Sequence, residues 1–201
     1  MSRLRWAAPT IQFLCLAAAF AAWYGLTATQ SVSPLFLPTP ASVGNSLLAL
    51  VKTNAFWSAV SVTLATIAEA YAIAIAAGLA TAYLVTRSRF LTDTMEPLLA
   101  GLFTIPITLF FPMFILFFGV GTGSKIAYGA VYGFFPIALN TIAAFANFES
   151  RYLDAARSMG ASRADTFRHV LLPGALPVIA NGMRIGFFIA FASVLGGEVL
   201  S

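Results

Sequence analysis

Charged residues are scarce in this sequence. Lysine, arginine, aspartate and glutamate together make up 9% of the chain, whereas hydrophobic residues make up 60% and the mean hydropathy is +0.89. Soluble domains contain about 25% charged and about 45–50% apolar residues. A water-soluble fold of 201 residues could not remove that much apolar surface from water. The composition therefore excludes an ordinary soluble domain and indicates an integral membrane protein.

The sequence also has only one cysteine, one histidine and no recognisable nucleotide-binding motif. The single Cys15 cannot form an internal disulfide and is too few for a cysteine-based metal site. His169 is the only histidine and has no second ligand at metal-binding spacing. The glycine-rich turn Gly119–Ser124 lacks the G-x-x-x-x-G-K-[ST] spacing of a phosphate-binding loop. Because no nucleophile–base arrangement is present either, we expect no catalytic residues, no cofactor, no metal and no ATP hydrolysis by this chain itself.

Long apolar runs divide the chain into predicted membrane spans, because a helix needs about 20 apolar residues to cross about 30 Å of hydrocarbon. Five runs are long enough: Trp6–Ala28, Phe56–Val85, Leu98–Val120, Ile126–Phe148 and Ala175–Val199. Pro106 and Pro112 interrupt the third run, and Pro136 lies in the fourth. Prolines are tolerated in membrane helices when neighbouring groups satisfy the freed carbonyls. We therefore predict an all-α, polytopic helical bundle.

The first apolar run has two interpretations, a cleaved signal peptide or an uncleaved anchor. It is longer than a typical signal-peptide core, which favours the anchor. The proline-rich stretch Thr29–Asn54 predicts an extramembrane loop that ends in a short amphipathic helix near Val43–Val51. We therefore expect residues 1–55 to form an anchor helix and external loop, and residues 56–201 to form the core.

The positions of the basic residues predict the orientation of the spans. If the N-terminus is cytoplasmic, eight arginines lie inside and only Lys52 and Lys125 lie outside. The eight are Arg3, Arg5, Arg87, Arg89, Arg151, Arg157, Arg163 and Arg168. Trp6, Trp23 and Tyr24 fit an aromatic belt at the membrane interface. We read the net charge of +4 as a sign of this topology, and we expect lipid rather than nucleic acid around the chain.

One stretch, Glu149–Pro173, interrupts the apolar background, and we call it the charged segment. It contains seven charged residues, out of eleven basic and seven acidic residues in the whole chain. Such a stretch between apolar spans must lie in water, and the orientation above places it in the cytoplasm. It is therefore where this protein could meet a soluble partner.

The charged segment predicts two short helices. One apolar stripe at a spacing of three predicts the first: Leu153, Ala156 and Met159. Gly160 suits the left-handed position that commonly ends a helix. Ser162 and Asp165 form a capping box that begins the second helix, and Pro173 marks its end. The two helices and the glycine corner could fit a groove on a cytoplasmic protein and transmit motion to the spans. The alternative is a solvated loop with incidental helices.

The charged segment resembles a known loop. D-A-A-R-S-M-G from Asp154, followed by F-x-x-V-x-L-P from Phe167, is similar to the E-A-A-x-x-x-G…I-x-L-P loop of permease subunits of ATP-binding-cassette (ABC) importers. In that family the loop is the coupling helix, which docks into a cleft of a cytoplasmic ATPase. Asp154 replaces the usual glutamate, and Val170 the usual isoleucine. The resemblance implies these ATPase-coupling residues: Leu153, Asp154, Ala155, Ala156, Gly160, Val170, Leu172 and Pro173.

Three further segments resemble the nitrate/sulfonate/taurine branch of these permeases. They are L-P-T-P-A-S-V from Leu37, P-L-L…T-I-P-I-T-L-F-F-P-M-F-I-L-F-F-G-V-G from Pro97, and F-P-I-A-L-N-T from Phe135. The resemblance implies a type I ABC importer permease in the bacterial plasma (inner) membrane, with residues 56–201 as the permease core. It also implies a permease homodimer, a separate ATPase subunit and an external or periplasmic solute-binding protein. Such permeases have a sixth span, which we expect to be missing here.

Two acids are candidates for the translocation path or its gate. Glu69 lies well inside the second run, and a charged side chain at the centre of a membrane helix costs about 2.5–3.5 kcal/mol on insertion scales. It either lines the path or is a protonated or paired acid packed against another helix. Glu198 matches an acid that the family often has at the outer end of this span, where it either shapes the external gate or faces interfacial water. We expect Arg184 to be a cytoplasmic-side anchor.

The resemblance implies a permease for a small polar or anionic solute, such as a sulfonate or nitrate. Two other functions stay open. An ion-gradient-driven transporter or channel predicts several intramembrane acids or a broken-helix site with repeat symmetry, and we find one deeply placed acid and no convincing repeat. A truncated, non-transporting fragment is the other alternative, because of the missing sixth span.

Overall fold

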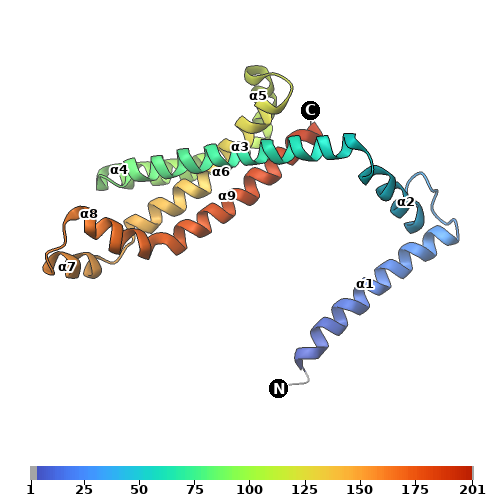
Figure 1. Ribbon diagram of the computed structural model, residues 1–201, viewed down its shortest axis with the longest axis horizontal. Coiled ribbons are helices and arrows are strands. Elements are labelled where there is room, and N and C mark those ends of the chain that lie inside the picture. The colour runs from blue at the N-terminus through green and yellow to red at the C-terminus, as the bar shows by residue number, and fades with distance from the viewer. Residues whose placement is uncertain (1–3, 201) are drawn as a thin grey trace. The chain divides into compact units, whose positions relative to one another are not determined.

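The computed structural model describes the backbone of residues 4–200 and the side chains of residues 10–106 and 108–200. Over residues 4–200 the chain is built from helices without strands, which confirms the all-α prediction (Figure 1). It divides between Val60 and Ser61 into two compact units, which we call unit 1 and unit 2. Arg3 lies outside the described residues, and so do the side chains of Arg5 and Trp6.

Unit 1 contains α1 (Leu4–Ala28), α2 (Pro40–Val51) and the start of α3 (Asn54–Val85). The predicted amphipathic helix is present as α2, but it begins three residues earlier than Val43. Thr39 explains the earlier start, because its side-chain oxygen accepts a hydrogen bond from the backbone N–H of Ser42 at 3.2 Å. Pro40 then occupies the first turn, where its missing N–H has no cost.

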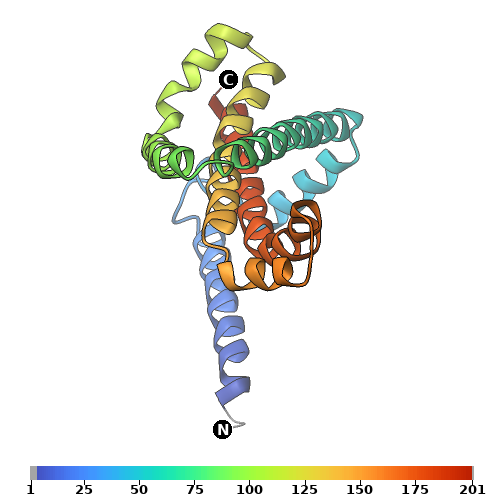
Figure 2. The same cartoon turned by 90° about the vertical axis from the view of Figure 1, so that its left-hand side faces the viewer.

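Unit 2 contains the rest of α3 and all later helices. Two long helices, α6 (Thr122–Ala146) and α9 (Leu172–Leu200), lie side by side, and α3 packs against both (Figures 1 and 2). The remaining elements are α4 (Arg89–Thr104), η1 (Ile107–Phe110), α5 (Phe111–Phe118), α7 (Ser150–Ser158), α8 (Arg163–Thr166) and η2 (Phe167–Leu171).

Glycines bring α6 and α9 into backbone contact. Gly133 on α6 faces Gly186 on α9, while Gly129 faces the carbonyl of Ala190 and Gly182 faces the carbonyl of Pro136. Each helix thus contributes a G-x-x-x-G pair to the contact. A Cβ atom added at Gly186 would lie only 2.9 Å from the carbonyl oxygen of Gly133. Lipid supplies no hydrophobic force to join helices, so close packing of small residues is what holds them together. The contact between α6 and α9 is therefore the core of unit 2.

The expected third span, Leu98–Val120, is not one straight helix. α4 begins earlier, at Arg89, and ends at Thr104, and the axis of the following helix is bent by 70° from it. The break falls at Ile105, whose backbone is extended (ψ 129°), as expected for the residue before Pro106. Pro112 does not break the chain, because it lies in the first turn of α5.

The prediction that Pro173 ends a helix is wrong. α8, the π-turn η2 and α9 form one helix from Arg163 to Leu200, and Pro173 lies inside it. The backbone N–H of Leu172 bonds to the carbonyl of Phe167, five residues back. In a regular helix the proline ring would clash with the carbonyl of His169, four residues before it. The wider π-turn directly before the proline relieves this clash, so the helix continues.

Four helices in the described part of the chain are long and apolar enough to cross a membrane, and a fifth span is obtained if α4 and the bent helix after it count as one. The four are Thr10–Ala28, Asn54–Val85, Thr122–Ala146 and Arg163–Leu200. Length and composition thus support a multi-pass membrane protein with four or five spans.

The glycine contact predicts the effect of adding a methyl group. We expect Gly186→Ala to lower the melting temperature in detergent, because the new Cβ would lie 2.6 Å from Ile137 Cγ1 and 2.9 Å from the Gly133 oxygen. Overpacking of this kind costs about 1–3 kcal/mol. Gly196→Ala on the same helix is the control, since nothing lies within 4 Å of its added Cβ. Equal melting temperatures for the two variants would contradict the packing described here.

Candidate functional site

The first helix of the charged segment ends in a Schellman motif. α7 covers Ser150–Ser158, and Gly160 follows with φ +82°, a conformation that favours glycine. The N–H of Ala161 donates to the carbonyl of Ala156 at 3.1 Å, and the N–H of Gly160 donates to that of Arg157 at 2.9 Å. These two bonds define the motif. The predicted left-handed position of Gly160 is confirmed.

The second helix begins at the predicted capping box. The Ser162 side chain accepts a hydrogen bond from the N–H of Asp165 at 3.2 Å, and the Asp165 carboxylate accepts one from the N–H of Ser162 at 3.3 Å. The side-chain hydrogen bond from Ser162 lowers the pKa of the exposed Asp165 carboxyl, and the backbone bond lowers it further. The corner between α7 and α8 is thus fixed by hydrogen bonds on both sides.

Aromatic side chains attach this corner to the spans. The Phe148 ring, just after α6, lies 6.1 Å from the Tyr152 ring of α7. It also packs on Gly174 near the start of α9, where an added Cβ would come within 2.5 Å of Phe148 Cε2. Farther along the segment, the Phe145 ring of α6 lies 6.1 Å from the Phe167 ring of η2. The charged segment is therefore packed against the ends of both α6 and α9.

The residues implied to contact an ATPase differ in their exposure. Five are exposed, two are half-buried and one is buried; the exposed ones are Asp154, Ala155, Gly160, Leu172 and Pro173. Leu153 and Val170 are half-buried, and Ala156 is buried. The predicted apolar stripe is also wrong in one member, because Met159 follows the last helical residue of α7 and is 83% exposed. Ala156 thus supports the segment from beneath, whereas Asp154 and Ala155 face outward.

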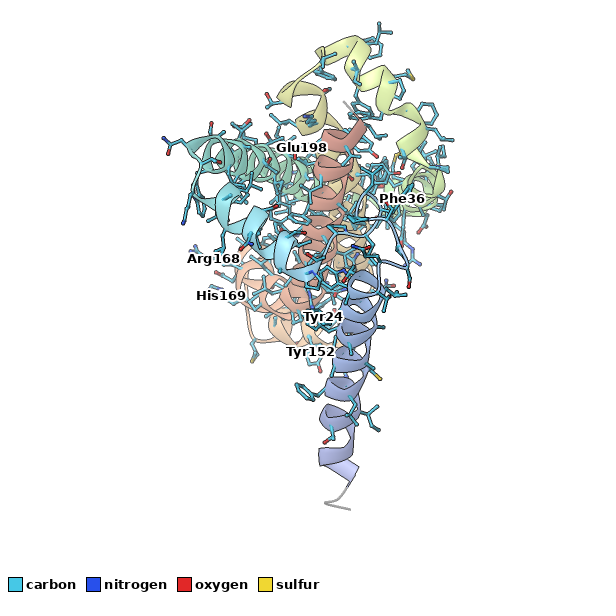
Figure 3. The ribbon with its side chains drawn as sticks, turned by 90° about the vertical axis from the view of Figure 1, so that its right-hand side faces the viewer. Tyr24, Phe36, Tyr152, Arg168, His169 and Glu198 are labelled. Atoms are coloured by element: carbon cyan, nitrogen blue, oxygen red, sulfur yellow. The ribbon has the colours of Figure 1, made fainter. Side chains whose placement is uncertain are left out.

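Charges on α7 pair locally. Arg157 lies 3.6 Å from the Asp154 carboxylate, and Arg151 pairs with Glu149. Exposed pairs of this kind contribute at most about 1 kcal/mol, so Asp154 stays free to exchange partners. Arg168 and His169 of η2 lie near Tyr152, at the end of unit 2 away from Glu198 (Figure 3).

An open cleft of about 910 Å³ lies beside α7. The end of α6, α7, η2 and the start of α9 all line it, with Asn147, Tyr152, His169 and Val178 among the lining residues. Within residues 4–200, no three His, Cys, Asp or Glu side chains are grouped to hold a metal ion.

Glu69 lies at the middle of the 32-residue α3, on its exposed side. The buried residues of α3 lie on the other side, where Ala70, Ala74 and Gly78 face α6. No cation of the described residues lies within ion-pair distance of the Glu69 carboxylate. In this chain Glu69 is therefore not packed against a neighbouring helix.

Glu198, near the end of α9, is half-buried and joins two spans. Its carboxylate accepts a hydrogen bond from the Thr63 hydroxyl of α3 at 2.8 Å. A second bond lies farther along the same pair of helices, where the Tyr71 hydroxyl donates to the carbonyl of Met183 at 3.0 Å. Arg184 is exposed on α9. Interpreting Glu198 as a purely water-facing acid would miss its bond to α3.

Sequence analysis overlooked the glycine faces of α6 and α9 and the anchoring role of Phe148. The first has a visible signal, since G-A-V-Y-G from Gly129 and G-M-R-I-G from Gly182 both match a helix-packing motif. The second has none, because the ring of Phe148 meets Gly174 only after the charged segment has folded back.

The fold defines a multi-pass membrane protein with a folded polar segment between its last two long helices. Residues 73–201, well over half of the chain, match the family described as "Binding-protein-dependent transport system inner membrane component", and the chain belongs to this family. It is an inner-membrane permease component, the translocation subunit of an ABC importer of the nitrate/sulfonate/taurine branch.

Similar proteins include three transport permeases. The taurine transport system permease protein TauC of Escherichia coli (strain K12) is 29% identical over 209 residues, covering 99% of this chain and 76% of that protein. The formylaminopyrimidine transport permease protein ThiX of Halalkalibacterium halodurans is 29% identical over 192 residues (96% and 75%). The riboflavin transport system permease protein RibX of Chloroflexus aurantiacus is 29% identical over 174 residues (86% and 65%).

The Schellman motif predicts a local effect of substituting Gly160. We expect Gly160→Ala to speed amide hydrogen exchange at Gly160 and Ala161 by about 5- to 30-fold, because a left-handed alanine costs about 1–2 kcal/mol. Gly160→Asn is the matched variant and should cause a smaller increase, since asparagine tolerates this conformation better. If alanine leaves the exchange of both amides unchanged, the Schellman motif does not form in solution.

Proposed function

We propose that this permease is driven by a separate cytoplasmic ABC ATPase that binds the charged segment through α7. The observation that supports this proposal is the rigid corner formed by the Schellman motif and the capping box, with Asp154 and Ala155 outward and Ala156 buried beneath. A helix held in this way can transmit a displacement of the ATPase to the spans, whereas a solvated loop would deform instead.

The proposal places the N-terminus and the charged segment in the cytoplasm. In unit 2 the ends of several helices meet the charged segment: Thr86, Arg89 and Asn147 line one small cavity, and Arg87 and Phe167 line another. The arginines counted as cytoplasmic in this unit therefore lie at one end of it, as the positive-inside rule requires.

Movement of α7 would reach the spans through contacts already described. A displacement of Tyr152 acts on Phe148, which contacts the start of α9 at Gly174. α9 is joined to α3 by the bonds Tyr71–Met183 and Thr63–Glu198. In this mechanism ATP-driven closure of two ATPase subunits moves the spans together between inward-open and outward-open states, and the Glu198 bond changes at the external gate.

Two copies of the chain form the translocation path in this proposal, and an external or periplasmic solute-binding protein delivers the solute. The exposed side of α3 around Glu69 supports a path there, because it carries small residues that leave room: Ala65, Ala68, Ala72 and Ala76. We propose a small polar or anionic solute, a sulfonate or a related nutrient. The taurine permease among the similar proteins supports this class.

The coupling role is tested with a matched pair of charge insertions. Ala155 on α7 and Ala164 on α8 are both exposed, so Ala155→Glu and Ala164→Glu add the same charge without disturbing the core. We expect Ala155→Glu to weaken co-purification with the ATPase by at least about tenfold, because it leaves an unpaired charge in the contact. ATP-dependent uptake in proteoliposomes should fall with it.

Ala164→Glu should retain both the ATPase and uptake. Circular dichroism checks that each variant keeps the helicity of the wild type. The coupling proposal is rejected if Ala155→Glu binds the ATPase as well as the wild type does, or if both variants lose it equally.

The path role of Glu69 is tested by Glu69→Gln, which removes the charge and keeps the shape. We expect the complex with the ATPase to assemble normally while the uptake rate changes several-fold, because the carboxylate lies in the middle of the span. Asp93→Asn is the control, since it removes a charge from the exposed pair with Arg89 at the end of α4. Identical uptake kinetics for Glu69→Gln and the wild type would remove Glu69 from the path.

A further inference from the structure

The stretch between α1 and α3 contains a long run without charge. Residues 29–51 include no Asp, Glu, Lys or Arg, and the first charged residue after them is Lys52. The run nevertheless exposes large apolar side chains. Leu35 and Phe36, in the turn before α2, are 86% and 82% exposed (Figure 3). In bulk water these exposed apolar side chains would be unfavourable.

α2 has a continuous apolar side and carries no charge. Val43, Leu47 and Leu50 recur at helical spacing, so they share one side, and all three are exposed. Asn45 lies on the opposite side together with the exposed Leu48, and Ser42 and Ser46 lie between the two sides. None of the twelve residues of α2 is buried. Because no described part of the chain covers this apolar side, the boundary between lipid headgroups and acyl chains could bury it.

Two tryptophans, one on α1 and one on α3, form hydrogen bonds with the two ends of α2. The Trp23 indole N–H of α1 donates to the carbonyl of Pro38 at 3.0 Å, just before α2 begins. The Trp57 indole N–H of α3 donates to the carbonyl of Val51 at 2.8 Å, at the last residue of α2. Tryptophan is enriched at the headgroup level of membranes. Both ends of α2 are thus tied to residues that prefer the interface.

We infer that Leu35–Val51 is an interfacial anchor that lies in the surface of the lipid bilayer. α2 is parallel to the membrane plane, with Val43, Leu47 and Leu50 among the acyl chains and Asn45 toward water, and Leu35 and Phe36 insert beside it. Both flanking helices, α1 and α3, are long and apolar enough to cross the membrane, so the stretch between them starts and ends near its surface. The lack of charge means that apolar insertion holds the anchor, so it should not depend on anionic lipid. A soluble protein partner is disfavoured because the segment offers it no charge to recognise.

Site-directed spin labelling of the full chain in liposomes tests the anchor. Cys15 is the only cysteine, so Cys15→Ala gives a background in which single labels can be placed. Leu47→Cys and Asn45→Cys put the label on opposite sides of α2 at exposed positions, where it should not disturb the fold. We expect the ratio of collision with oxygen to collision with a water-soluble nickel chelate to be several-fold higher at position 47 than at position 45.

Each other result overturns the inference. High nickel accessibility at both positions would mean that α2 lies in water. Low accessibility to both reagents at position 47 would mean that protein covers it, either unit 2 or a second copy of the chain. The measurement is repeated in purely zwitterionic phosphatidylcholine and with added phosphatidylglycerol. The same ratio is expected in both, and a lipid-like signal that needs the anionic lipid would contradict anchoring by apolar insertion.

Discussion

Backbone contact between α6 and α9 is the constraint on which the rest of unit 2 depends. Four glycines, Gly129, Gly133, Gly182 and Gly186, allow the two helices to approach until carbonyl oxygens face the opposite backbone. α3 can then pack against both, with Ala70 and Ala74 in the remaining space. Because the glycines let side chains of the opposite helix, such as Ile137 and Val194, pack directly on the backbone, the strength of the contact comes from dispersion at close range, which is lost steeply when the helices separate. The pair therefore moves as a unit or not at all.

In the charged segment, local interactions determine the shape and long-range packing determines the position. Its corner is made by neighbours in sequence, through the bonds around Gly160 and Ser162, so it keeps its shape whatever its surroundings. Its position on the spans depends on distant partners, since Phe148 packs against both Tyr152 and Gly174. The charged segment thus combines a stable local shape with packing contacts that can change. This combination suits a segment that must stay folded while it moves.

The same division explains what could be predicted from the sequence. The long spans follow from hydropathy, and the corner follows from Gly160 and the capping box, because each depends on residues close together. Two details differ from the prediction. Pro173 lies inside a helix because a π-turn precedes it, and Met159 lies outside the apolar stripe because α7 ends before it. At Pro106 the helix does break, and the residue before it, Ile105, is extended. The roles of Glu69 and Glu198 stay predictions, although the bond from Thr63 already gives Glu198 a partner.

The continuity of α8, η2 and α9 has a mechanical consequence. Together they form a rod of 38 residues, about 57 Å long at 1.5 Å per residue, which exceeds the membrane thickness. The glycine contact joins the middle of the rod, near Gly182 and Gly186, to α6. When the rod tilts together with α6 as one rigid unit, its two ends swing in opposite directions. Displacing the tip at Arg168 one way therefore carries the tip at Glu198 the other way, so one movement can close one side of the membrane as it opens the other.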